Sequence, residues 1–231
     1  MLAIIYGRAD SEKQLLRKYP SRVKKIEEID RVYEEMKDEL KVEDRGFFAG
    51  FRKWNKQRQV NKFEKNKDNP FHAGARGENK VIEKLSNLND NFHVLCGVRI
   101  ELPYWATYNG QKNLRSAQMD LVVVSTKGVF LIEVKNWSDD YVKNNEKLDP
   151  HEQADRAGLV LWIFLKSIIK NIRVTNVLLS IQDNLQYSSY YKAVYVSSLE
   201  KINGFLEDRR EILSEKEVKK IVDNLKYYVT R

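Results

Sequence analysis

The stretch 118–135 constrains the fold of this chain more than any other part of the sequence. It contains two short apolar runs rich in β-branched residues, 121–124 and 129–134, separated by the polar residues 125–128. This pattern predicts a β-hairpin in which Gly128 supplies the positive φ of the turn. Because each run is apolar at almost every position, we expect both faces of these strands to be covered, as in the middle of a sheet.

Three charged residues interrupt this apolar hairpin: Asp120, Glu133 and Lys135. Side chains alternate along a strand, so Glu133 and Lys135 project from the same face, and Asp120 begins the first strand beside the end of the second. Buried carboxylates are costly without compensation, and two that converge repel each other unless a cation lies between them. A hard divalent ion such as Mg²⁺ suits these oxygen ligands.

The same three residues are equipment for hydrolysing a phosphodiester bond. A metal ion neutralises the developing charge and supplies an activated water, and the ammonium of Lys135 can hold or polarise that water. The alternative is a buried ion pair between an acid and Lys135 that has no catalytic role. The spacing D-x12-E-x-K within a hydrophobic hairpin favours the hydrolytic interpretation.

The residues Asp120, Glu133, Val134 and Lys135 resemble the motif of the PD-(D/E)XK nucleases, with Met119 at the position where that motif often has proline. The resemblance implies that the two carboxylates and the carbonyl of Val134 hold the metal. It further implies that Lys135 positions the attacking water and that cleavage leaves a 5′-phosphate.

A wider ordered set narrows the resemblance. The set comprises G-x-x-G-E at 74–78, Q-x-D at 118–120 and E-V-K-N-W at 133–137, and it resembles the NERD (nuclease-related) domain over about residues 71 to 200. The resemblance implies an α/β sandwich with a mixed central β-sheet flanked by helices. The strands expected from the sequence agree with this fold, and they lie at 92–102, 121–124, 129–134, 172–180 and 192–196.

Glu78 opens the helix after Gly77 and lies four residues before Ile82 and seven before Leu85, so it points to the inward face of that helix. An acid in the first turn of a helix is often only a partner of the helix dipole. The inward direction and the resemblance together favour Glu78 as a third acidic group, acting through a water or as a direct metal ligand.

Gln153 lies near the start of a second helix, which Asp149 and Pro150 mark clearly as N-cap and first helical residue. It is in line with apolar residues, so its amide is either satisfied by backbone groups or directed at the site. The NERD domains resemble this segment in having Gln after E-x-K, which implies that Gln153 helps to place the water or the scissile phosphate. We assign no role to His151 or His93.

The charge of the chain, 41 basic and 33 acidic residues, favours an anionic partner. Segment 45–70 holds eight basic and only two acidic residues, with aromatic residues interleaved. Phe47, Phe51 and Trp54 lie at helical spacing and predict a core-facing stripe beneath a basic face. Two alternatives are stacking of an aromatic ring on a base and a helix lying on an anionic membrane. The predicted nucleic-acid contacts are Arg52, Lys53, Lys56, Arg58 and Lys62, with Lys112 and Arg115 from an expected polar loop at 103–117.

The sequence Asp-Asn-Pro at 68–70 is the best domain boundary. It divides a helical, basic and aromatic N-terminal extension, 1–70, from a nuclease domain, 71–231. An amphipathic helix beyond Pro20 packs within the chain, or against a partner protein or a second copy. The single cysteine, Cys96, excludes an internal disulfide and predicts a cytoplasmic location. The longest apolar run, 159–165, is too short to cross a membrane.

The sequence therefore predicts a Mg²⁺-dependent nuclease, with Mn²⁺ as a substitute metal, that acts on DNA without sequence preference as an endonuclease. One alternative is a module of the same fold that binds nucleic acid without cutting it. The other is an adaptor that uses the N-terminal helices to contact a membrane surface or a protein.

Overall fold

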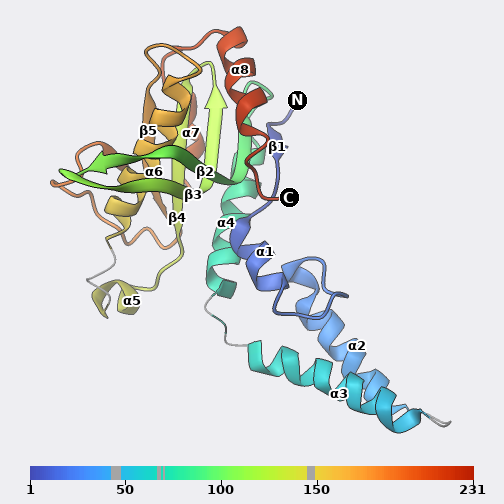
Figure 1. Cartoon of the computed structure of the whole chain (residues 1–231). Helices are drawn as coiled ribbons and strands as arrows, with labels where there is room; N and C mark the ends of the chain where they lie inside the picture. The colour runs from blue at the N-terminus through green and yellow to red at the C-terminus, as the bar shows by residue number, and fades with distance from the viewer. Residues whose placement is uncertain (43–47, 67–68, 70, 145–148) are drawn as a thin grey trace. The chain divides into compact units, whose positions relative to one another are not determined.

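The computed structural model describes residues 1–42, 48–66, 69, 71–144 and 149–231 (Figure 1). The chain forms two compact units. We call Met1–Asp10 with Gly77–Arg231 the sheet unit, and Ser11–Arg76 the helical unit. Within the described ranges, every helix is too short or too polar to span a membrane.

A six-stranded mixed sheet forms the centre of the sheet unit, with its strands in the order β1-β2-β3-β4-β5-β6 (Figure 1). Strands β2, β3 and β4 are antiparallel, whereas β1 runs parallel to β2 and β5 and β6 continue parallel to β4. The mixed sheet flanked by helices confirms the predicted fold class. The strands are β1 (Ile4–Tyr6), β2 (His93–Tyr108), β3 (Gln111–Ser125), β4 (Gly128–Lys135), β5 (Val174–Ser180) and β6 (Val194–Ser198), and the helices are α4 (Phe71–Ser86), α5 (Asp139–Asn144), α6 (Pro150–Lys166), α7 (Ile202–Glu207) and α8 (Glu215–Leu225).

The predicted hairpin is confirmed as β3 and β4. Their pairing runs from Leu121–Ile132 to Ser125–Gly128, so two residues form the turn. Gly128 has a φ of +131°, which only glycine adopts without strain. Every residue of β4 except Lys135 is buried, as the continuous apolar run predicted.

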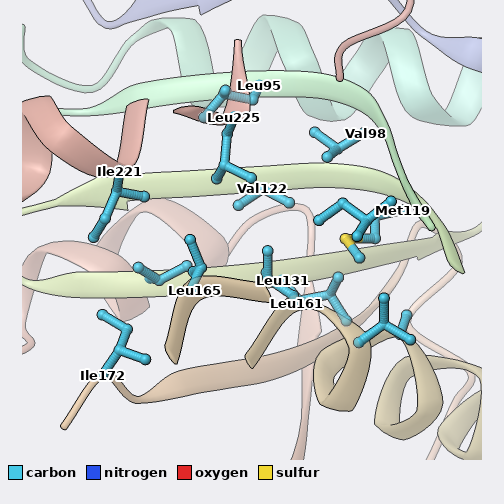
Figure 2. Packing of buried hydrophobic residues seen from close by; sticks show 14 of the residues in the cluster. Leu95, Val98, Met119, Val122, Leu131, Leu161, Leu165, Ile172, Ile221 and Leu225 are labelled. Atoms are coloured by element: carbon cyan, nitrogen blue, oxygen red, sulfur yellow. The ribbon is translucent and has the colours of Figure 1, made fainter. Parts of the chain in front are cut away.

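Apolar side chains cover both faces of the hairpin. Alternation places Val122 and Leu131 in one cluster with residues of α6 and α8, such as Leu161 and Leu225 (Figure 2). Residues 121, 123, 130 and 132 belong to a second cluster with α4 and α7. The site residues at the end of the hairpin are therefore positioned by a core in which truncating one buried leucine to alanine costs about 2–5 kcal/mol.

The loop predicted at 103–117 is wrong. Strand β2 continues to Tyr108 and β3 begins at Gln111, with Asn109 and Gly110 at positive φ in the turn between them. Ala106 pairs with Leu114, and both are buried. Only these few apolar residues indicate a strand, and because most residues around them are polar, the sequence suggested a loop. Segment 138–148, which follows β4, contains α5, and its residues 145–148 lie outside the described residues.

The chain termini join the sheet unit at Gly97 of β2. Strand β1 pairs with β2, and Thr230 donates from its backbone N–H to the carbonyl of Cys96 and from its hydroxyl to Asp10. A Cβ on Gly97 (φ +60°) would lie 2.6 Å from the Thr230 hydroxyl, so no other residue fits here. The two compact units are thus divided differently from the predicted division at residue 70, because β1, near the N-terminus, belongs to the sheet unit. The functional division into an N-terminal extension and a nuclease domain stays a prediction.

In the helical unit, α1 (Asp10–Leu16), the short 3-10 helix η1 (Ile26–Glu28), α2 (Ile29–Lys41) and α3 (Ala49–Asn66) follow one another in the chain, and the beginning of α4, up to Arg76, also belongs to this unit. The amphipathic pattern beyond Pro20 is confirmed, because its apolar residues share one core cluster. That cluster comprises Leu15, Tyr19, Val23, Ile26, Ile29, Val32, Met36, Val60, Phe63 and Ala75.

The predicted core-facing aromatic stripe of α3 is wrong. Phe51 and Trp54 are 66% and 56% exposed, whereas Val60 and Phe63 are each 3% exposed. Helical spacing shows that residues share a face, but it does not show which face turns inward. Phe47, at the start of the predicted stripe, lies outside the described residues, as do Arg45 and Lys67.

Candidate active site

The candidate site lies where the paired part of the β3–β4 hairpin ends. The last pair there is Leu121 with Ile132, and the next residue on each strand is an acid, Asp120 and Glu133. The backbone N–H of Val134 donates a 2.8 Å hydrogen bond to Oδ2 of Asp120. The side chain of Asp120 thus reaches across to the strand that carries Glu133.

Lys135 and Glu133 form an ion pair in the same place. Nζ of Lys135 lies 2.8 Å from Oε1 of Glu133, and the two side chains are only 13% and 11% exposed. This contact confirms that both residues project from one face of β4. The Lys135 ammonium also lies 5.3 Å from the centre of the Trp137 ring, which adds a cation–π interaction.

Negative charge is crowded at this point. Burial raises the pKa of Asp120 well above its ordinary value, and the carboxylates of Glu133 and Glu78 raise it further. The Lys135 ammonium and the N–H of Val134 act in the opposite direction but do not offset the rise. A buried carboxyl group whose pKa is raised by like charges is characteristic of functional sites.

Glu78 is buried, with 4% of its surface exposed, on the face of α4 that carries Val81 and Leu85. Burial raises the pKa of the Cys96 thiol to about 12, with a contribution from the Glu78 charge. The preceding residue explains how α4 approaches the site: a Cβ on Gly77 would lie 2.9 Å from Cβ of Asn136. Gly77 therefore allows close contact between the two ends of the sequence motif.

The donor set suits a divalent cation. Within the described ranges, no three or more His, Cys, Asp or Glu side chains are grouped to hold one ion. Mg²⁺ does not require such a group, because it commonly takes one or two protein carboxylates and keeps several waters. Asp120 and Glu133 supply two carboxylates whose mutual repulsion a cation would relieve. The carbonyl of Val134 and the carboxylate of Glu78 remain predicted ligands, direct or through water.

The start of α6, where Gln153 lies, is fixed as predicted. The side chain of Asp149 accepts hydrogen bonds from the backbone N–H groups of His151 and Glu152, and Pro150 is the first helical residue. Gln153 itself is half-buried, and its backbone N–H donates to the carbonyl of Asp149. Its role toward a water or a phosphate stays a prediction.

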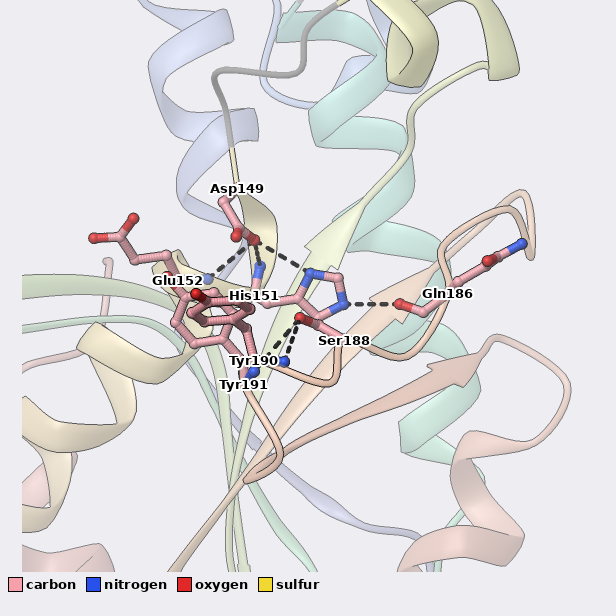
Figure 3. Close-up of polar contacts among 7 residues, drawn as sticks. All are labelled: Asp149, His151, Glu152, Gln186, Ser188, Tyr190 and Tyr191. Carbon is pink, nitrogen blue, oxygen red and sulfur yellow. Dashed lines mark hydrogen bonds and ion pairs between the residues drawn. The ribbon is translucent and has the colours of Figure 1, made fainter.

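His151 has structural contacts that the sequence did not indicate (Figure 3). Nδ1 lies 3.2 Å from Oδ1 of Asp149, Nε2 lies 2.8 Å from the carbonyl of Gln186, and the ring stacks on that of Tyr191. The ring thus fastens segment 181–191 to the beginning of α6.

Two polar residues beside the site, Asn184 and Gln182, were also missed. Asn184 donates 2.9 Å hydrogen bonds from Nδ2 to the carbonyl of Trp137 and to Oδ1 of Asp139. Gln182 donates from Nε2 to Oδ1 of Asn136 at 3.0 Å. A signal was available, because parallel strands such as β4 and β5 end at the same edge of a sheet, where polar residues converge.

The predicted nucleic-acid contacts fall in both units. Lys112 and Arg115 are exposed on β3 of the sheet unit, and Arg115 pairs with Glu101 at 3.1 Å and lies over the Trp105 ring. The five residues of α3 belong to the helical unit, and their role stays a prediction. Of these, Arg52, Lys53, Arg58 and Lys62 are exposed and Lys56 is half-buried.

Residues 73–181 match the family model of NERD, the nuclease-related domain. The match extends from the first turns of α4 to the residue after β5, so it includes Glu78, Asp120, Glu133, Lys135 and Gln153. Neither a curated protein nor a solved structure matches the chain.

Proposed function

We propose, from a chain whose residues 73–181 form a nuclease-related domain, that this protein is a Mg²⁺-dependent nuclease that hydrolyses DNA internally. The single observation that carries the proposal is the crowding of two carboxylates at the end of the β3–β4 hairpin, with Lys135 bound to one of them. Buried acids in such an arrangement destabilise a fold, and a divalent cation relieves that cost.

Asp120, Glu133 and the carbonyl of Val134 would hold the cation, with Glu78 adding negative charge nearby. When bound, Mg²⁺ or Mn²⁺ supplies neutralisation of the charge that develops on the phosphate and a more acidic water. The hydrogen bond from the Val134 N–H holds Oδ2 of Asp120, and the other oxygen of that carboxylate would bind the cation.

Lys135 would act on the nucleophile and on the phosphate. Its ammonium has three N–H donors, of which one reaches Glu133, and the other two can orient a water and stabilise a phosphate oxygen. Trp137 and Glu133 restrict the position of this ammonium. Gln153, near the start of α6, would place the water or the scissile phosphate.

The substrate we propose is DNA, bound through its phosphates without sequence preference, in the cytoplasm. The net charge of +8 supports an anionic partner. The exposed cations of α3 and β3 are suited to phosphate contacts, which position a nucleic acid but do not read its sequence.

The test is cleavage of circular and linear DNA, double- and single-stranded, in Mg²⁺, Mn²⁺ or EDTA. Glu133→Gln and Lys135→Gln should each abolish metal-dependent cutting, whereas the matched charge-removing variant Glu200→Gln should cut normally, because Glu200 is 86% exposed. Cutting of circular DNA identifies an endonuclease. A folded protein that binds DNA but does not cut it under these conditions would overturn the proposal in favour of a binding module.

A further inference from the structure

An exposed stripe runs along α3. Phe51, Trp54, Arg58, Lys62 and Lys65 follow one another at steps of three and four residues, which places them on one side of the helix. All five side chains are exposed. We call these five residues the α3 stripe; at 1.5 Å per residue it is about 21 Å long.

The direction of the stripe is fixed by the opposite side of α3. Val60 lies nine residues after Phe51, which is half a turn around the helix, and it is buried with Phe63 in the core of the helical unit. The ring of Phe63 packs at 5.2 Å from that of Tyr19. The apolar side of α3 is therefore already used for packing, and the stripe faces solvent.

The N-terminal end of the stripe is aromatic. The rings of Phe51 and Trp54 lie 5.9 Å apart with an angle of 30° between their planes. The guanidinium of Arg58 lies 5.7 Å from the centre of the Trp54 ring. Because the two large rings are exposed to water, covering them with a flat partner lowers the free energy of the complex.

The C-terminal end of the stripe is cationic. Arg58, Lys62 and Lys65 border a shallow surface hollow of about 500 Å³ that Asn55 and Asn61 also line. The two asparagine side chains offer both donors and acceptors of hydrogen bonds. This end of the stripe therefore suits a polyanionic ligand that carries several phosphates together with groups that form hydrogen bonds.

We infer that the α3 stripe binds single-stranded nucleic acid, with unpaired bases stacked on Phe51 and Trp54 and phosphates at Arg58, Lys62 and Lys65. The choice of nucleic acid as the partner rests on the proposed function. Aromatic rings next to cations are the arrangement by which proteins hold single strands without reading their sequence. In a duplex the base faces are already stacked on one another, so the two rings would have no partner.

A membrane surface fits the α3 stripe less well. Helices that lie on membranes have a continuous apolar face, separate from the charged one, that enters the lipid. In α3 the apolar residues Val60 and Phe63 are buried, and the two exposed rings share their side of the helix with the three cations.

The first test measures binding in EDTA by fluorescence anisotropy, with the full chain carrying Glu133→Gln so that no substrate is cut. The probes are a labelled oligothymidylate, a mixed-sequence single strand and the duplex of the latter. Phe51→Leu with Trp54→Leu should weaken single-strand binding by at least about tenfold and change duplex binding little, because stacking contributes about 1–3 kcal/mol per base. Tyr187→Leu with Tyr190→Leu is the matched control, since both tyrosines are exposed on the sheet unit.

The second test measures the salt dependence of single-strand binding. Replacing Arg58, Lys62 and Lys65 with glutamine should lower the slope of log affinity against log salt by about 2, at about 0.7 per lost phosphate contact. The control replaces three exposed lysines of the sheet unit, Lys201, Lys216 and Lys219, with glutamine and should not change the slope by this amount.

Three results would overturn the inference: equal affinity for duplex and single strand, unchanged single-strand binding by the leucine variant, or binding to phosphatidylserine vesicles that the same substitutions abolish. Failure of the proposed function is separate from these results. If the stripe variants lose single-strand binding but the parent protein cuts no nucleic acid, the inference stands without the nuclease. If cutting depends on Glu133 and the stripe variants bind normally, only the inference fails.

Discussion

Lys135→Met should destabilise the protein strongly when no divalent cation is present. The substitution keeps the length of the side chain but removes the ammonium that lies 2.8 Å from Glu133. The carboxylate of Glu133 is then left without its cation, almost buried and close to Asp120. The charge of Glu133 already raises the pKa of Asp120. Removing one partner of a buried ion pair costs about 3–5 kcal/mol, and because the two side chains are 13% and 11% exposed we expect the lower end, about 3 kcal/mol.

The assay is unfolding in EDTA, monitored by circular dichroism, with urea to measure the free energy of unfolding and with heat to measure the midpoint temperature. For a chain of this size a loss of about 3 kcal/mol lowers the midpoint of thermal unfolding by about 6–12 °C. The double variant Glu133→Gln with Lys135→Met should recover most of the loss, because removing both charges leaves no unpaired one. Lys84→Met is the control: its partner Glu200 is exposed at 3.8 Å, so the cost should stay below about 1 kcal/mol. Equal stability of Lys135→Met and Lys84→Met, or no recovery in the double variant, would refute the reasoning.

Three further predictions concern the surroundings of the site. Burial and the neighbouring carboxylates raise the pKa of Asp120 in the folded protein. Protonated Asp120 therefore contributes to the free energy of unfolding in full below the ordinary pKa of an aspartate, and this contribution is lost as the pH rises through the raised pKa. Asp120→Asn should remove this decline in urea unfolding measured in EDTA over a pH series; an unchanged pH profile would contradict it. Gly77→Ala should lower the free energy of unfolding by about 1–3 kcal/mol, because the added Cβ clashes with Asn136. Gly50→Ala, whose Cβ meets open space, should raise it by up to about 1 kcal/mol. Equal effects of the two variants would show that the close approach at Gly77 is not required. His151→Ala should speed amide hydrogen exchange in segment 181–191 without lowering the stability of the sheet, and unchanged exchange would mean that the ring does not fasten the segment.

The hairpin and its charged residues could be predicted because the information is local. Continuous apolar runs, a glycine at the turn and three interrupting charges all lie within 118–135. The same holds for the start of α6, where Asp149 is directly followed by Pro150. Local patterns of this kind decide an element whenever the rest of the fold agrees with them.

Other parts of the site depend on residues distant in sequence. Asn184 meets Trp137 only because β5 runs parallel to β4, and His151 meets Gln186 only after segment 181–191 has folded back. The exposure of Trp54 could not be inferred either, because the periodicity of α3 allows either side to face inward. The side is decided by Val60 and Phe63, which fit the core that α2 offers.

The central claim is that Asp120 and Glu133 together hold a divalent cation. Titration of the full chain with Mn²⁺, followed by calorimetry and by the electron paramagnetic resonance of the free ion, tests it without any cleavage assay. We predict binding that Asp120→Asn and Glu133→Gln each abolish and that Glu200→Gln retains. Mn²⁺ binding that persists unchanged in both site variants, or a folded parent protein that binds no Mn²⁺, would contradict the claim.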